Sequence, residues 1–332
     1  MNILVTGGAG YIGSVLTEEL ARQGHNVIVF DNLTRGHRAA VIPEAVFIHA
    51  DLGDGEALEE TFQHHAIDAV MHLAAKTSVA DSMTEPGRFF QNNVACGVDL
   101  LECMLKHGVK KIIFSSSAAI YGQPEEIPVA ETAPALPINT YGESKLIFER
   151  ILKWYTQAKG LSCISLRYFN VAGASRRFGS DHYPETSLIP RVIRVALGQV
   201  EYLPVFGTDY DTEDGTCVRD YIHVLDIAQA HILALQHLEE RAGIKVYNLG
   251  NGVGYSVMEV VEIAGKVTGT TIPVKVNARR NGDPACLVAS SALARLELGW
   301  IPRYHGLESI VKSAWKWQKE HSVDMTTRRH RV

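Results

Sequence analysis

The stretch from residue 6 to residue 13, Thr-Gly-Gly-Ala-Gly-Tyr-Ile-Gly, sets the expectations for the whole chain. It follows the apolar run Ile3–Val5, typical of a buried strand, and precedes residues 14–24, which have helical spacing and end in glycine. A glycine turn between a strand and a helix lets backbone N–H groups approach a diphosphate, and the helix N-terminus adds positive partial charge. Its glycines repeat every third residue, at Gly7, Gly10 and Gly13. This spacing alone indicates nucleotide binding only weakly.

An acidic residue follows the next predicted strand. The apolar run Val27–Phe30 ends at Asp31, about 20 residues after the glycine turn, where an acid accepts hydrogen bonds from the adenosine ribose hydroxyls. A carboxylate there also repels a 2′-phosphate. We therefore expect NAD as the cofactor, although the nearby cations Arg35 and Arg38 leave NADP open.

Strand and helix patterns alternate through the first half of the chain. Further strands are predicted over residues 45–50, 69–75, 110–117 and 163–169, and helices over residues 86–107 and 141–159. These strands are apolar throughout, which is typical of a parallel sheet covered on both faces. The predicted fold class is α/β: a Rossmann-type doubly wound parallel sheet with a smaller C-terminal α/β substrate-binding domain. We place the NAD-binding domain in residues 1–170 and the smaller substrate-binding domain in residues 171–332, with some segments returning to the first.

Composition narrows the function further. The 332 residues carry a formal net charge of -5 without a long basic run, so nucleic acid is not expected as a partner. No apolar stretch approaches the length of a membrane span, and the N-terminus enters a strand at once, leaving no room for a signal peptide. The 5 cysteines lack C-x-x-C spacing, which favours free thiols in the cytoplasm and no metal site. His64 and His65 are interpreted as a solvated helix end.

A tyrosine and a lysine on one helix supply the first catalytic candidates. Tyr141 and Lys145 are four residues apart and share a face, and the ammonium group is expected to lower the pKa of the phenol. Tyr155 and Lys159 repeat this spacing. In a strand–helix–strand crossover, the start of a helix lies near the carboxyl ends of the strands, where ligands bind. Tyr141 stands at that start and Tyr155 about 21 Å farther along the axis, so we interpret Tyr155 as a packing or surface residue.

Ser117 ends the fifth predicted strand, on the same edge of the sheet as the glycine turn. Its hydroxyl is placed to hydrogen-bond a substrate hydroxyl and to relay a proton to Tyr141. A serine run can also be a simple exit from a strand. The pair Tyr141 and Lys145 favours the catalytic interpretation.

These features together resemble the extended short-chain dehydrogenase/reductase family and, within it, the UDP-hexose 4-epimerases. The similarity spans nearly the whole chain and is carried by residues 114–122, 141–145, 166–170, 212–224 and 247–250. It implies that Tyr141 takes the proton of the sugar 4-hydroxyl while the C4 hydride passes to NAD. The keto sugar then turns over and takes the hydride back on its opposite face, so UDP-galactose becomes UDP-glucose. UDP-GalNAc and UDP-GlcNAc are further possible substrates.

The resemblance also implies two sets of contact residues. The NAD contacts include the glycine turn and the small residues after the fourth strand. The full set is Gly7, Gly10, Tyr11, Ile12, Gly13, Asp31, Asn32, Leu33, Thr34, Arg35, Gly36, Asp51, Leu52, Leu73, Ala74, Ala75, Lys76, Asn92, Tyr141, Lys145 and Phe169. Those for the UDP-sugar are Ser117, Tyr141, Asn170, Ser187, Leu188, Val205, Phe206, Arg219, Arg280, Asp283 and Cys286. The family commonly forms dimers through the equivalents of the helices over 86–107 and 141–159, so a homodimer is expected.

Three positions depart from the family pattern. Lys76 stands one residue before the usual lysine, where this chain has Thr77, and Ser187 replaces a histidine or asparagine. Cys286 stands where some relatives carry a bulky tyrosine beside the sugar's C2 substituent. A small side chain there leaves room for an N-acetyl group, which is why N-acetylated substrates are expected.

Alternative functions remain open from the sequence. Nucleotide-sugar dehydratases place an Asp-Glu pair after the fifth strand, whereas this chain has Ser-Ser there. Epimerases of UDP-glucuronate or UDP-GlcNAc are a second possibility, and no cation is evidently dedicated to a carboxylate. From another class, a non-catalytic NAD-sensing regulatory protein would typically lack the pair Tyr141 and Lys145.

Overall fold

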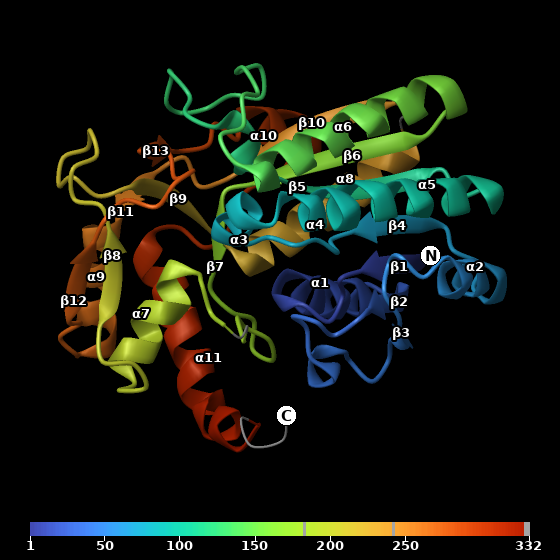
Figure 1. Ribbon diagram of the computed structural model, residues 1–332. Coiled ribbons are helices and arrows are strands. Elements are labelled where there is room, and N and C mark those ends of the chain that lie inside the picture. The colour runs from blue at the N-terminus through green and yellow to red at the C-terminus, as the bar shows by residue number, and fades with distance from the viewer. Residues whose placement is uncertain (182–183, 241–242, 329–332) are drawn as a thin grey trace.

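The structure is a computed structural model and describes residues 1–181, 184–240 and 243–328. Its centre is a seven-stranded sheet in the order β10-β6-β5-β4-β1-β2-β3, and every pairing along it is parallel (Figure 1). The strands are β1 (Asn2–Thr6), β2 (Asn26–Asp31), β3 (Val46–His49), β4 (Ala69–His72), β5 (Lys111–Ser117), β6 (Ser162–Tyr168) and β10 (Ile244–Leu249). The predicted Rossmann-type doubly wound sheet is confirmed.

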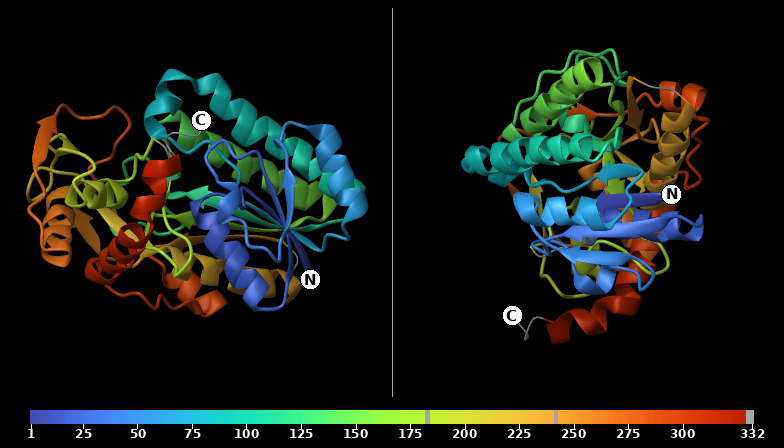
Figure 2. Two further views of the ribbon diagram at one scale, coloured as in Figure 1. Left: turned by 90° about the horizontal axis from the view of Figure 1, so that it is seen from below. Right: turned by 90° about the vertical axis from the view of Figure 1, so that its right-hand side faces the viewer.

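Helices cover both faces of this sheet because successive strand residues point to opposite sides. Ile3 and Val5 pack into one apolar core and Leu4 into another. Figure 2 shows the resulting layers. The first core includes residues of α1 (Tyr11–Arg22), α8 (Val224–Glu240) and α10 (Ala292–Leu298), and the second those of α2 (Gly55–His64), α5 (Cys96–Lys106) and α6 (Thr140–Lys159).

The helix predicted over residues 86–107 is interrupted. The chain forms α3 (Val79–Thr84), α4 (Pro86–Phe90), a π-helical turn over Gln91–Ala95 and then α5. The wider turn accompanies a specific contact: the amide of buried Asn93 accepts a hydrogen bond from Lys76 N at 2.8 Å and donates to Ser144 Oγ at 3.0 Å. Asn93 in the π-helical turn thus connects the loop after β4 to α6. Such turns often occur at functional sites.

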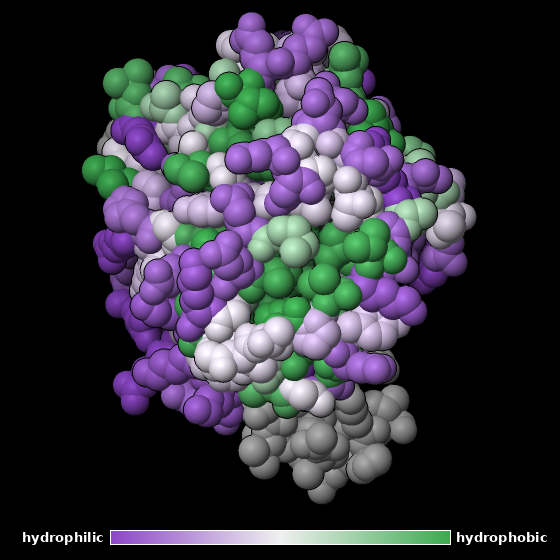
Figure 3. All heavy atoms as spheres, turned by 90° about the vertical axis from the view of Figure 1, so that its left-hand side faces the viewer, coloured by the Kyte–Doolittle hydropathy of each residue, from purple (hydrophilic) through white to green (hydrophobic). Residues whose placement is uncertain are grey.

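The second half adds two smaller sheets beside the carboxyl ends of the main one (Figure 1). Their strands are β7 (Asn170–Ala172), β9 (Val218–His223), β11 (Gly254–Ser256) and β13 (Cys286–Leu287) in one, and β8 (Leu203–Phe206) and β12 (Val274–Asn277) in the other. α7 (Leu188–Ala196), α9 (Val257–Thr268) and α11 (Leu307–Arg328) share a third apolar core with β8. Figure 3 shows this side of the molecule, where apolar side chains gather near the middle of a mainly polar face.

The division of the chain near residue 170 stays a prediction. β10 belongs to the main sheet although it lies far beyond residue 170, and it pairs with β6 along its whole length. His64 is exposed at the end of α2, as expected for a solvated helix end. Among the described residues, no helix has the length and apolar character needed to cross a membrane.

Candidate active site

A cavity of about 1090 Å³ lies between the carboxyl ends of the main sheet and the second half of the chain. The glycine turn, the ends of β2 and β5, the loop after β4 and the start of α6 form its sheet side. Arg219, Arg280 and the start of α7 form the opposite side. Ligands bind at this edge in doubly wound sheets because the loops there are free to shape a site.

The glycine turn is packed too closely for side chains. A Cβ on Gly13 would lie 2.2 Å from the carbonyl oxygen of Gly7, and one on Gly7 would lie 2.7 Å from the backbone nitrogen of Ala74. Gly7 also has a φ of +74°, which disfavours other residues. Gly10 is the N-cap of α1 and no side chain caps the helix there. The turn is therefore a bare backbone cradle at a helix N-terminus, which fits the diphosphate of a dinucleotide.

Asp31 stands in the cavity wall, where an NAD ribose is expected. Its Oδ2 accepts a hydrogen bond from Ala9 N at 3.0 Å, and its Oδ1 accepts from Leu33 N at 2.8 Å. These two bonds hold the carboxylate in place, and each oxygen retains a lone pair for a ribose hydroxyl. The wall thus matches the predicted preference for NAD.

Tyr141, Lys145 and Ser117 meet at the cavity. Lys145 is 2% exposed, and its Nζ donates a hydrogen bond to Ser115 O at 2.8 Å and lies 5.9 Å from the centre of the Tyr141 ring. Asn139 fixes the start of α6, because its side chain accepts from Gly142 N at 2.8 Å. Helix start and strand end thus bring the three predicted catalytic side chains together.

The predicted lowering of the Tyr141 pKa is wrong for the chain without its cofactor. Burial raises the pKa of Tyr141, and a hydrogen bond with Ser117 counteracts part of this rise. Burial also lowers the pKa of Lys145 to about 7, partly opposed by the Glu149 carboxylate. The spacing of the two residues indicated proximity but not the degree of burial, which penalises both charged forms.

Glu149 is a neighbour of the site that sequence reasoning missed. It lies one helical turn beyond Lys145 and accepts hydrogen bonds from Ser116 Oγ at 2.6 Å and from Arg167 Nη2 at 2.7 Å. A signal was present, because residues 141, 145 and 149 recur at helical spacing. A buried acid at the third position indicates a buried partner, and Arg167 is that partner.

The opposite wall carries the two predicted phosphate-binding arginines. Arg280 Nε lies 3.2 Å from Asp283 Oδ2, and its guanidinium stacks over the Phe206 ring at 4.3 Å. Arg219 Nη1 donates to Val218 O at 2.9 Å. Both arginines line the cavity, so two guanidinium groups face the site across from the glycine turn.

Most of the remaining predicted site residues also line the cavity. They are Tyr11, Ile12, Asn32, Thr34, Arg35, Gly36, Asp51, Leu52, Leu73, Ala74, Ala75, Lys76, Asn92, Phe169, Asn170, Ser187 and Leu188. Thr77, next to Lys76, lines it as well.

Three predicted contact residues are not part of the cavity lining: Leu33, Val205 and Cys286. Val205 is 1% exposed and packs into the third core, because strand alternation turns its neighbours Pro204 and Phe206 to the cavity instead. Leu33 has a φ of 59° and packs against the first core. Cys286 is half-buried between two lining residues, Pro284 and Leu287.

One group of possible metal donors lies elsewhere. Glu59, Cys103 and His107 place their donor atoms within 4.8 Å of one another, and the described residues contain no other such group. Lys106 Nζ lies 2.8 Å from Glu59 Oε1, so an ammonium group already compensates this carboxylate. All five cysteines are free thiols.

Comparison with known proteins gives one consistent result. A UDP-glucose 4-epimerase of Halalkalibacterium halodurans is 51% identical, over 98% of this chain and 98% of that protein. One of Streptococcus mutans is 50% identical, over 97% and 98%. A crystal structure of the UDP-glucose 4-epimerase from Bifidobacterium longum, in complex with NAD+ and UDP, matches 97% of this chain and 99% of that one with a TM-score of 0.94 and 38% identity.

The family comparison agrees with these relatives and with the resemblance found in the sequence. The model of the NAD dependent epimerase/dehydratase family matches residues 3–250, which include the glycine turn, Asp31 and the pair Tyr141 and Lys145. The chain belongs to the NAD dependent epimerase/dehydratase family.

Proposed function

We propose that this chain interconverts UDP-galactose and UDP-glucose with a bound NAD, the activity for which its close relatives are named. One observation carries the proposal: a single cavity joins a dinucleotide cradle, a tyrosine–lysine–serine group and two arginines. The first part suits NAD, the second suits proton transfer at a sugar hydroxyl, and the third suits a diphosphate. No Asp-Glu pair follows β5, where the chain continues with Ala118 and Ala119, which disfavours dehydration.

NAD, held by the glycine turn and Asp31, would supply a reversible acceptor for the C4 hydride. The chain's own residues handle the proton. Tyr141 takes it from the 4-hydroxyl, and Ser117 shares a hydrogen bond with the Tyr141 phenol. Lys145 provides a positive charge near the phenol, 5.9 Å from the ring centre, when it is protonated.

The chain must hold the nucleotide while the sugar turns. Arg219 and Arg280 supply charge-assisted hydrogen bonds for the diphosphate, and Asp283 orients Arg280. The strong contacts are thus at the UDP end. A firm grip there keeps the intermediate from escaping, while weak contacts at the sugar leave both faces available to the hydride.

The direct test uses the purified protein as it is isolated. Incubation with UDP-galactose, without added NAD, is expected to yield UDP-glucose, measured by anion-exchange chromatography of the nucleotide sugars. The ultraviolet spectrum of the same preparation reports retained nicotinamide. Unchanged UDP-galactose in a preparation that carries NAD would contradict the proposal.

We propose further that UDP-GlcNAc and UDP-GalNAc are accepted, because the thiol of Cys286 is small and lies beside the cavity. The variant Cys286→Tyr is expected to lose activity on UDP-GlcNAc by at least tenfold and to keep activity on UDP-galactose. Cys286→Ser is the matched control, since it retains the small volume. Absence of wild-type turnover of UDP-GlcNAc would refute this extension.

We also propose that the chain forms a homodimer and works in a reducing cytoplasm. The supporting observations are the family resemblance, the free cysteines and the exposed side of α6, where Trp154 is 69% exposed. Sedimentation equilibrium of the wild type is expected to give a dimer mass, and Trp154→Glu is expected to shift it towards the monomer. A monomeric wild type would remove this part of the proposal.

A further inference from the structure

A second, smaller cavity of about 340 Å³ opens beside the glycine turn. Four segments line it: residues 9–14, residues 35–40 after β2, residues 176–181 after β7, and α11. Gly10, Tyr11 and Arg35 line both this cavity and the larger one, so the two share a wall. A volume near the low end for small-molecule sites suits a ligand of sugar-phosphate size.

Guanidinium groups outnumber carboxylates in this wall. Arg35, Arg176 and Arg177 line the cavity, whereas Asp181 is its one carboxylate among the described residues. His37 contacts Asp181: its Nε2 lies 2.8 Å from the backbone oxygen and 3.8 Å from the carboxylate. The wall therefore carries an excess of positive charge, which favours an anion.

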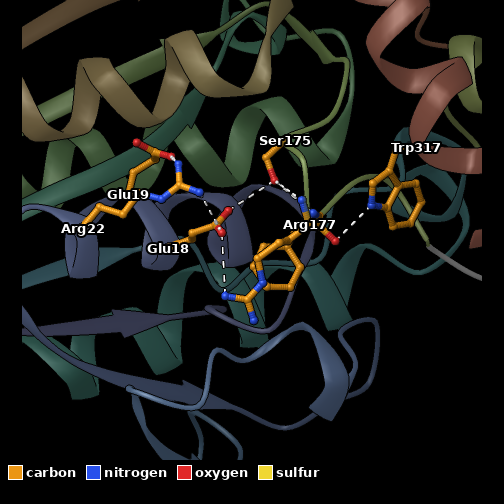
Figure 4. A network of polar contacts seen from close by, with 7 residues as sticks. Glu18, Glu19, Arg22, Ser175, Arg177 and Trp317 are labelled. Carbon is orange, nitrogen blue, oxygen red and sulfur yellow. Dashed lines mark hydrogen bonds and ion pairs between the residues drawn. The ribbon is translucent and has the colours of Figure 1, made fainter. Parts of the chain in front are cut away.

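The neighbouring acid does not cancel this excess. Arg177 Nη1 lies 3.8 Å from Glu18 Oε1 (Figure 4). The same oxygen of Glu18 also lies 3.1 Å from Arg22 Nη2. Glu18 is 4% exposed and orients Arg177, while Arg22 also pairs with Glu19 Oε1 at 2.7 Å. Even if Glu18 offset the charge of Arg177 in full, Arg35 and Arg176 would still outnumber the one carboxylate of the lining, Asp181.

The loop that carries two of these arginines is held in place. Ser175 Oγ accepts hydrogen bonds from Arg177 N at 3.2 Å and Phe178 N at 2.9 Å, and Trp317 Nε1 donates to Arg177 O at 3.0 Å (Figure 4). Gly179 packs so closely that a Cβ there would lie 2.5 Å from the Trp317 ring. The arginines are thus presented by a backbone that is fixed before any ligand binds.

The remaining wall is suited to the uncharged part of such a ligand. The Trp317 and His321 rings stack with centres 4.6 Å apart, and both residues line the cavity. Ala39 and Ala40 line it as well. Aromatic and small apolar groups next to guanidinium groups match a molecule with one carbon-rich end and one phosphate end.

We propose that this cavity binds a phosphorylated small molecule of sugar-phosphate size, and that this ligand and the dinucleotide weaken each other's binding. The two ligands are both anions, share the wall at Arg35 and face the same helix N-terminus at Gly10. Two anions bound side by side repel each other, so each ligand lowers the affinity of the chain for the other. By thermodynamic linkage, the two affinities fall by the same factor. The site is separate from the sugar-binding end, so it does not depend on which UDP-sugar is the substrate.

Calorimetric titration of the NAD-loaded protein tests the site, with glucose 6-phosphate as the probe. Excess UDP in all solutions fills the substrate end of the larger cavity. We expect one saturable site per chain, weakened at least tenfold in Arg176→Gln and in Arg177→Gln. Arg150→Gln removes an exposed cation from α6 and serves as the matched control, with unchanged binding. Non-saturable binding, or equal losses in the control, would overturn the site.

Two further measurements separate binding from folding and test the coupling. Arg176→Gln is expected to keep the epimerase activity and the melting temperature of the wild type, because Arg176 is exposed and outside the larger cavity. Glucose 6-phosphate at a concentration that just saturates the wild-type site is expected to raise the dissociation constant of NAD several-fold in the wild type and by a smaller factor in Arg176→Gln. An NAD dissociation constant that is the same with and without the probe would overturn the coupling.

Discussion

The two ends of α6 carry the same sequence motif in opposite surroundings. At the start of the helix, Tyr141 lines the large cavity and Lys145 is 2% exposed. Tyr141 shares a hydrogen bond with Ser117, and Lys145 Nζ donates one to the Ser115 carbonyl oxygen. At the far end, Tyr155 donates a hydrogen bond to the Glu102 carboxylate and Lys159 is exposed.

The difference shows that the tyrosine–lysine spacing does not by itself make a base. The pKa of both tyrosines is raised by burial, to about 12 for Tyr155. Their neighbours differ in sign: the hydroxyl of Ser117 favours the Tyr141 phenolate, whereas the negative charge of Glu102 disfavours that of Tyr155. Only the first site is therefore prepared to hold a phenolate once cofactor and substrate are bound.

The largest expected contrast is in turnover. Tyr141→Phe removes the hydroxyl that we propose takes the substrate proton, and it is expected to lower kcat by about 10² to 10⁴. Tyr155→Phe removes a hydroxyl far from the cavity, and its kcat is expected to stay within about twofold of the wild type. Initial rates with UDP-galactose measure both. Equal losses in the two variants would break the comparison.

The pH dependence of stability sharpens the contrast between the lysines. In the folded chain Lys145 loses its proton near pH 7, whereas in the unfolded chain it keeps it up to its ordinary value of 10.5. Between these pH values the unfolded state binds more protons, so the free energy of unfolding rises with pH. Relative to Lys145→Met, the cofactor-free wild type is expected to gain about 1–3 kcal/mol from pH 7 to pH 9.

Lys159→Met is the control for this measurement, because Lys159 is exposed at the far end of the same helix. Urea unfolding at each pH gives the free energies. The difference between wild type and Lys159→Met is expected to stay flat over the same range. A flat difference for Lys145→Met as well would mean that Lys145 stays protonated in the fold, contrary to the expected effect of its burial.

The smallest expected contrast is between variants that disturb the first and the last residues of α6. Asn139→Ala removes the N-cap that accepts from Gly142 N, at an expected cost of about 1 kcal/mol. Gly160→Ala places a side chain on a residue with a φ of +68°, at a similar cost of about 1 kcal/mol. Both variants are expected to melt earlier by a similar amount, but only Asn139→Ala is expected to lose activity, since it loosens the turn that holds Tyr141. Equal melting temperatures together with equal activities in Asn139→Ala and Gly160→Ala would contradict this expectation.

Local sequence signals predicted the parts of the fold that depend on neighbouring residues. The apolar runs became β1 to β6, and Gly160 ends α6 in the left-handed conformation that its position demands. The meeting of Tyr141, Lys145 and Ser117 at one cavity was also predictable, because helix starts and strand ends meet at one edge of a parallel sheet. The catalytic role of these residues stays a prediction.

Features that depend on distant residues escaped prediction. No local pattern marks the π turn over Gln91–Ala95, which accompanies the contacts of Asn93 with Lys76 and Ser144. The raised pKa of Tyr141 follows from burial by the complete fold, which no pair spacing reports. The inward side chain of Val205, in contrast, could have been predicted from the sequence. Side chains alternate along a strand, so Val205 points to the face opposite its neighbours Pro204 and Phe206.

The position of β10 has a consequence for synthesis on the ribosome. β6 is complete at residue 168, but its pairing partner β10 begins only at Ile244. At about 5–20 residues per second, a nascent chain exposes the unpaired edge of β6 for several seconds after that strand has emerged. An open, apolar strand edge is a template for wrong pairing with other chains. The glycine turn and Tyr141 are therefore made early, yet the sheet that supports them is complete only when about three quarters of the chain has been translated.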